Sequence, residues 1–98
     1  MKEHEYLMIV AMEECAEIQQ ALSKSLRFGL DDTHPETPEL SNEKQVLLEF
    51  YQLCAVMERL QKERVLQTPS EMQIDDIKTR KMEKVAHFMK YSKSKKII

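Results

Sequence analysis

Apolar residues recur at helical spacing along three stretches of this 98-residue chain. Between Glu3 and Leu26 there is no Gly or Pro, and apolar positions return about every 3.6 residues. This pattern predicts a first helix over about 3–28, with Gly29 just beyond its C-terminus. The second and third apolar stretches predict helices over about 42–67 and 69–91.

Local signals mark where the second and third helices begin. Asn42 is an acceptable N-cap, with Gln45 three residues later as its capping-box partner. The pair Thr68–Pro69 predicts an N-cap followed by the first helical residue, whereas Ser70 or Asp75 could instead cap a later start. The segment 29–41 contains Gly, two Pro and two Asp, which predicts an irregular loop long enough to help cover a site.

These elements predict an all-α fold, an antiparallel helical bundle formed by one domain over 1–98. Three helices with wide apolar faces do not easily close a core by themselves. We therefore expect a homodimer or homotetramer in which a second copy completes a four-helix-type core.

Composition and charge narrow the functional classes. The net charge of −2 argues against a general affinity for nucleic acid, although the tail Lys90–Lys96 is locally basic. Cys15 and Cys54 lie in predicted helices and are expected to be small core residues in a reducing compartment. We expect no signal peptide, because the N-terminus is polar, and no apolar run is long enough to span a membrane. We therefore expect a cytoplasmic protein without membrane partners.

Two carboxylates stand where apolar side chains are expected. Glu14 interrupts the apolar stripe of the first helix, and Glu49 interrupts that of the second. One such glutamate is usually a boundary residue whose head reaches water, but the same interruption in two helices favours a site. Glu17 and Glu13 add charge beside Glu14, and a hard cation such as Mg²⁺ would remove the repulsion. Gln52, one turn beyond Glu49, could supply an amide oxygen or hold a metal-bound water.

The third helix shows an interruption of opposite sign. Lys81 lies on its apolar stripe and Lys84 borders it. Either lysine could simply extend its charged head to solvent. Together, they could instead face the acidic cluster and hold phosphates that the metal also holds.

Three motifs follow one another along the chain: EECAE with SKSLRFG at 13–29, Asn42 with LEF and AVME up to residue 58, and KMEKV with Tyr91-Ser92. In this order they resemble the all-α nucleoside triphosphate pyrophosphohydrolases, the MazG-like superfamily, and most of all its short forms common in bacteriophages. The likeness covers almost the whole chain. An ExxE pair alone would be weak, because any charged helix can contain one.

The resemblance implies a hydrolase that converts a nucleoside triphosphate to the monophosphate and pyrophosphate, with Mg²⁺ held by an ExxE pair and a later ExxD pair. By position, Glu14 and Glu17 form the first pair, and Glu49 opens the second. Glu13 or Glu17 would act as general base. The candidate substrate contacts are Lys24, Arg27, Lys81, Lys84 and Tyr91.

The chain departs from the family pattern at one ligand. Gln52 stands where the second pair ends in Asp, and a neutral amide oxygen binds Mg²⁺ more weakly than a carboxylate. The chain could be an active enzyme with fewer metals, an enzyme that uses Glu58 or another group differently, or an inactive relative. Glu58 lies more than two helical turns beyond Glu49 and is not expected to replace the carboxylate.

Two functions without catalysis stay open. One is an impaired relative that binds nucleotides or a partner protein as a helical oligomer. The other is a structural helical dimer whose acidic residues form a solvated face.

Overall fold

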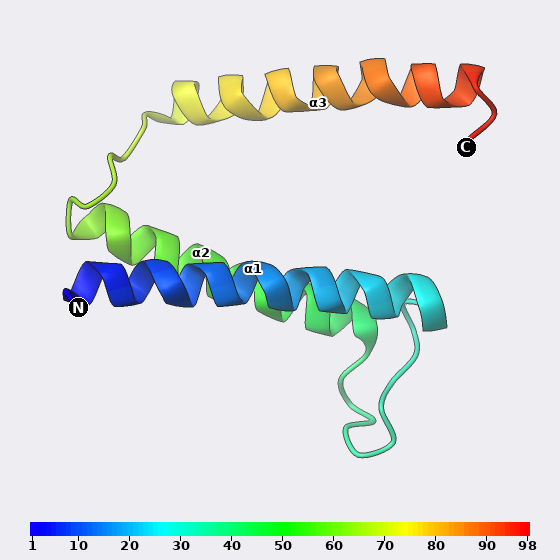
Figure 1. Ribbon diagram of the computed structural model, residues 1–98, viewed down its shortest axis with the longest axis horizontal. Coiled ribbons are helices and arrows are strands. Elements are labelled where there is room, and N and C mark those ends of the chain that lie inside the picture. The colour runs from blue at the N-terminus through cyan, green and yellow to red at the C-terminus, as the bar shows by residue number, and fades with distance from the viewer. The chain divides into compact units, whose positions relative to one another are not determined.

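The computed structural model describes residues 1–98 and contains three α-helices: α1 (Glu3–Phe28), α2 (Asn42–Lys62) and α3 (Glu71–Ser94) (Figure 1). The only strand-like pairing is an isolated bridge between Thr33 and Ser41. The prediction of an all-α chain is therefore confirmed. The chain divides into two compact units, Met1–Gln67 and Thr68–Ile98. The expectation of one domain over 1–98 stays a prediction.

Helix α1 has the predicted bounds. Gly29 adopts a positive φ of 98°, a conformation that costs glycine little, and its N–H donates to Ser25 O at 2.9 Å. Glu3 and Glu5 lie in the first turn and Arg27 in the last, so the charges at both ends interact favourably with the helix dipole.

Helix α2 begins where predicted, but a different residue caps it. Ser41 is the N-cap, and its hydroxyl accepts a hydrogen bond from the N–H of Lys44 at 3.2 Å. The proposed cap, Asn42, instead donates its side-chain amide to Gly29 O at 2.8 Å. The amide of Asn42 thereby ties the end of the loop to its beginning.

Helix α2 ends five residues before the predicted position. Arg64 adopts a positive φ of 62°, and the N–H of Val65 donates to Leu60 O at 3.0 Å, which closes the last turn. This left-handed conformation usually falls to Gly or Asn. Because Arg64 gives no such signal, the sequence pattern predicted a longer helix.

Helix α3 begins two residues later than the first of the predicted starts. Ser70 is its N-cap and forms a capping box with Gln73, so the alternative start at Ser70 is correct and the Thr68 cap is wrong. The helix continues to Ser94, three residues further than predicted, and Ile97 donates its N–H back to Ser92 O at 3.0 Å.

Helices α1 and α2 form an antiparallel hairpin in the first unit (Figure 1). Arg59 near the end of α2 pairs with Glu3 at the start of α1 at 2.8 Å. Buried or half-buried residues recur every three or four positions along α1 and form one stripe. They are His4, Leu7, Val10, Ala11, Glu14, Ile18, Ala21 and Ser25. Both interrupting glutamates lie within such stripes, as predicted.

Few apolar side chains are fully buried within one chain. Only Ala21 and Leu60 are, at 2% and 1% exposure, while large residues such as Leu47 and Phe50 stay about half exposed. Cys15 is exposed and Cys54 is half-buried, so the expectation of a core position is wrong for Cys15. None of the three helices combines the length and apolar composition needed to cross a lipid bilayer.

Candidate metal centre

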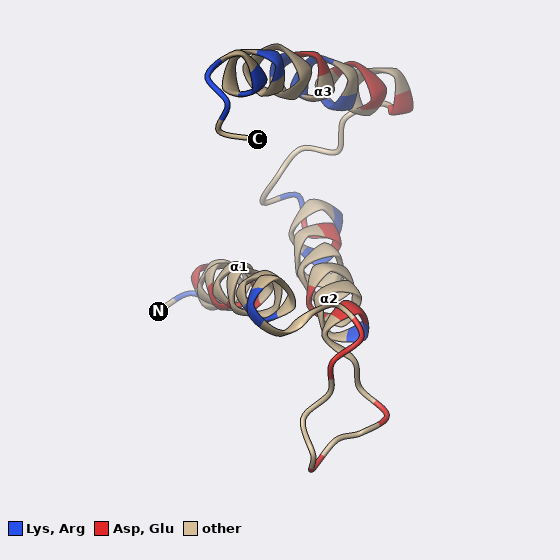
Figure 2. Ribbon diagram, turned by 90° about the vertical axis from the view of Figure 1, so that its right-hand side faces the viewer, with Lys and Arg blue, Asp and Glu red and all other residues tan.

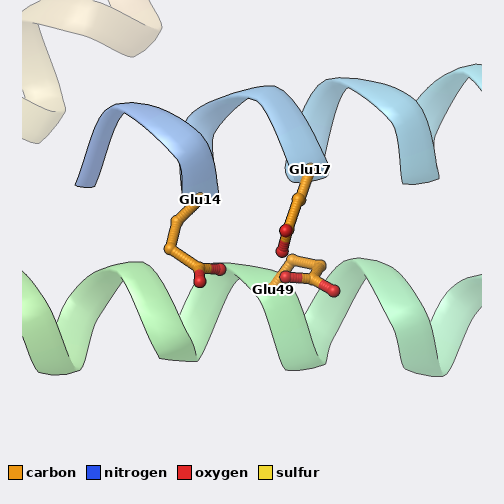
Figure 3. A group of neighbouring side chains, drawn as sticks. All are labelled: Glu14, Glu17 and Glu49. Atoms are coloured by element: carbon orange, nitrogen blue, oxygen red, sulfur yellow. The ribbon is translucent and has the colours of Figure 1, made fainter. Parts of the chain in front are cut away.

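Three carboxylates converge between α1 and α2. Glu14 and Glu17 project from successive turns of α1 toward Glu49 on α2 (Figure 3). One oxygen atom from each of the three lies within 4.8 Å of the others. The spacing of three residues places Glu14 and Glu17 on one side of α1, and the antiparallel pairing brings Glu49 opposite them. The sequence predicted all three as metal ligands.

The three carboxylates differ in burial. Glu49 is buried at 7% exposure, Glu14 is half-buried and Glu17 is exposed. The side-chain amide of Gln45, one turn before Glu49, donates to Glu49 Oε1. This hydrogen bond compensates part of the cost of burying the carboxylate.

The pKa of Glu17 is raised above its ordinary value. The main cause is the hydrogen bond that its protonated carboxyl donates to Glu49, followed by the negative charge of Glu49 and by desolvation. A hydrogen bond with Glu14 acts in the opposite direction. The raised pKa of Glu17 therefore reflects the carboxylate of Glu49 beside it, and a bound cation would offset the repulsion between the two.

Gln52 lies against the same carboxylates. When its amide nitrogen faces them, Nε2 lies 3.2 Å from Glu14 Oε2 and 3.0 Å from Glu49 Oε2, so that it can donate to both. Rotation of the amide by 180° presents its oxygen at the same place. Gln52 can therefore stabilise the carboxylates without a metal or offer a neutral fourth oxygen to one.

A cavity of about 630 Å³ adjoins the cluster, and Glu17 and Glu49 form part of its wall. Lys24 and Phe28 of α1 and the loop over 32–37 form further parts of the wall. The sequence predicted that this loop could help cover a site, and the cavity lies between the loop and the two helices. Its volume is in the usual range for small-molecule sites.

The other candidates in the first unit lie around this cluster. Lys24 lines the cavity, whereas Arg27 lies over the ring of Phe28, with 4.9 Å from its guanidinium carbon to the ring centroid. Glu13 is exposed and shares a shallow hollow on α1 with Glu17, outside the three converging carboxylates. Glu58 is exposed and does not belong to the cluster.

Three further candidates belong to α3 in the second unit. Lys81 and Lys84 border a groove of about 330 Å³ with Val85 and Phe88, as expected for lysines beside an apolar stripe. Tyr91 is exposed, and the ammonium of Lys95 lies 5.7 Å from its ring centroid. The role of these residues at the carboxylate cluster stays a prediction.

Two kinds of residue at the site were missed from the sequence. Gln45 was seen only as a capping-box residue, although its position one turn before Glu49 is a usable signal. Phe28 was noted only as part of the SKSLRFG motif, and His34 was interpreted as a surface or structural residue, because their place in the cavity depends on how the loop folds back.

Comparison with known proteins assigns no family. No protein-family model, no curated protein and no solved structure matches the chain.

Proposed function

We propose that this protein is a Mg²⁺-dependent nucleoside triphosphate pyrophosphohydrolase, which releases a nucleoside monophosphate and pyrophosphate. One observation carries the proposal: carboxylates from two helices place three oxygen ligands within 4.8 Å of one another beside a cavity. The ordered likeness of the three sequence motifs to the MazG-like superfamily supports the same function.

The chemistry of the cluster suits Mg²⁺. This ion prefers oxygen ligands, and it is commonly held by a few carboxylates together with substrate phosphates. Glu14, Glu17 and Glu49 would hold it, with Gln52 as a neutral oxygen ligand or a hydrogen-bond partner to a water. When bound, Mg²⁺ offsets negative charge on the phosphate oxygens and on the leaving pyrophosphate.

The side chains around the metal would perform the remaining steps. Glu17 or Glu13 accepts the proton of the water that attacks the α-phosphorus. Lys24 faces the cavity beside Glu17 and binds the phosphate chain. Arg27 at the end of α1 is a further candidate for contact with the phosphates.

The second unit is richer in positive charge than the first. Residues 68–98 contain eight Lys or Arg and four Asp or Glu, whereas residues 1–67 contain seven Lys or Arg and 13 Asp or Glu. Figure 2 shows basic residues concentrated toward the C-terminal end of α3. Because a triphosphate carries several negative charges, Lys81 and Lys84 are proposed as further cations that contact the phosphates, with Tyr91 near the nucleotide.

A homodimer or homotetramer is part of the proposal. The α1–α2 hairpin buries only Ala21 and Leu60 as apolar residues, while Leu47, Phe50 and Met57 of α2 remain exposed. A second hairpin packed on this face would give the four-helix-type core that a single chain lacks.

Pyrophosphate release from a panel of canonical and modified nucleoside triphosphates, measured with and without Mg²⁺, tests the enzyme. Release that requires Mg²⁺ and is lost in Glu49→Gln is expected. The matched variant Glu58→Gln, on the same helix but outside the cluster, should retain activity.

Gln52 supports a second function. A neutral residue among the ligands reduces the charge available to hold metal, which favours an impaired relative that binds nucleotides as a helical oligomer. This function predicts that Mg²⁺ and nucleotide together raise the melting temperature although no substrate is hydrolysed. A structural dimer predicts no effect of Mg²⁺ on the melting temperature.

A further inference from the structure

The cavity beside the carboxylates has two chemically different regions. Glu17, Glu49 and Lys24 form a charged region suited to a metal and phosphates. Phe28, His34 and Pro35 supply flat or apolar surfaces in the same cavity. A ligand that fits both regions has a polyphosphate joined to a flat, largely apolar group.

Phe28 is the only Phe, Tyr or Trp side chain that lines the cavity. It occupies the last position of α1, and the guanidinium of Arg27 lies over its ring. An aromatic ring in this position can stack on a nucleobase, because every base has a π-face.

His34 supplies a second flat group from the loop. Its Nδ1 accepts a hydrogen bond from the N–H of Glu36 at 3.1 Å. The neutral ring therefore carries its proton on Nε2, which leaves that N–H available as a donor to a ligand. Backbone hydrogen bonds hold the loop in this shape: Asn42 donates to Asp32 O at 2.9 Å, and Thr37 donates to His34 O at 2.9 Å.

We infer that this cavity holds the nucleoside of the substrate, with Phe28 stacking on the base and His34 contacting its edge. The inference rests on the proposed function, and it places the triphosphate at Glu17, Glu49 and Lys24. The loop over 29–41 then determines which nucleoside is bound. Phe28 and His34 are the residues expected to set specificity.

The test compares two ligands on the full chain by calorimetry in the presence of Mg²⁺. One is inorganic tripolyphosphate, and the other is the tightest-binding α,β-methylene deoxynucleoside triphosphate from a panel of four bases. The nucleotide is expected to bind about tenfold or more tightly than tripolyphosphate, which is the scale of one base stacking on an aromatic side chain.

Two variants remove the flat groups with little change elsewhere. Phe28→Leu keeps an apolar side chain, and His34→Asn keeps an acceptor for the N–H of Glu36. Each variant should reduce the ratio of the nucleotide affinity to the tripolyphosphate affinity severalfold or more. The affinity for tripolyphosphate itself should stay unchanged. Tyr6→Leu, an exposed aromatic position of α1 outside the cavity, should leave both affinities unchanged.

The outcomes separate this inference from the proposed function. If both variants keep the full nucleotide advantage, or if wild type has none, the nucleoside does not occupy the cavity. If tripolyphosphate fails to bind with Mg²⁺, while the nucleotide binds and responds to Phe28→Leu, the nucleoside pocket is supported and the placement of the triphosphate at the carboxylates is overturned.

Discussion

Gln52 of α2 reaches Glu14 across the helix pair, because its amide nitrogen can lie 3.2 Å from Glu14 Oε2 while it also donates to Glu49. Two carboxylates from different helices thus share one neutral partner. The amide lowers the cost of holding these charges close together when no metal is bound. With its oxygen turned inward, the same side chain can offer an uncharged oxygen ligand to a metal ion.

This relationship predicts the effect of a carboxylate at position 52. Gln52→Asp should raise the affinity for Mg²⁺ about tenfold or more, because it adds a charged oxygen ligand, and should lower the metal-free melting temperature, because it adds repulsion. Calorimetry with Mg²⁺ and thermal melting would measure the two effects. Gln52→Asn controls for the shorter side chain. An affinity equal to that of wild type would place residue 52 outside the metal's ligands.

Removing one charge from the cluster should have the opposite pair of effects. Glu14→Gln is expected to abolish the stabilisation by Mg²⁺ and to raise the metal-free melting temperature, because it removes repulsion with Glu17 and Glu49. For wild type, Mg²⁺ at 100 times its Kd should raise the melting temperature by about 10 °C or more. Glu58→Gln is the matched control. A Glu14→Gln protein that melts below wild type without metal would contradict the repulsion.

Stability without metal should depend on pH through Glu17. Its pKa is higher in the folded chain than its ordinary value of 4.5, chiefly because of Glu49. Folding thus favours the protonated form, so this contribution is fully present below pH 4.5 and is lost as the pH rises through the folded pKa. Metal-free wild type should therefore lose stability relative to Glu17→Gln as the pH is raised over this range.

The free energy of unfolding, measured by denaturant titration at several pH values, checks this dependence. Glu13→Gln, an exposed glutamate one turn away on α1, provides the matched control. If the difference between wild type and Glu17→Gln stays constant with pH, Glu17 does not titrate as the cluster requires. Mg²⁺ affinity should fall over the same range as the pH is lowered, because protons compete for the carboxylate.

The sequence predicts the parts of this site that depend on a single helix. The bounds of α1 follow from an uninterrupted apolar period that stops at Gly29, and that period places Glu14 within the packed stripe. The end of α2 was not predictable in this way, because Arg64 takes a left-handed conformation without Gly or Pro nearby.

The contacts between elements were harder to predict. The distance from Glu17 to Glu49 depends on the register of the hairpin, which the Arg59–Glu3 ion pair and the loop help to set. The register also decides that the amide of Gln52 lies within hydrogen-bond distance of Glu14. Sequence periodicity specifies which side of a helix is apolar, but it does not specify the register of two helices.

The exposed face of α2 yields a prediction about assembly. Leu47 and Tyr51 are four residues apart and are 51% and 64% exposed, so they lie on one side of the helix. If a second hairpin covers this side, Leu47→Asp removes a buried apolar side chain from each copy and inserts a charge. Leu47 is 51% exposed, so covering the rest of it contributes about 0.8–1.5 kcal/mol in each copy, and the dimer Kd should rise by about tenfold or more.

Sedimentation velocity over a range of protein concentrations would measure this change. Wild type is expected to sediment as a dimer or tetramer, and Leu47→Asp to shift toward the 11.6 kDa monomer. Lys62→Gln, at the exposed end of α2, changes the charge by the same amount and controls for the change of charge alone. A wild-type chain that remains monomeric at high concentration would show that the exposed apolar side chains serve another purpose, since no second hairpin then covers them.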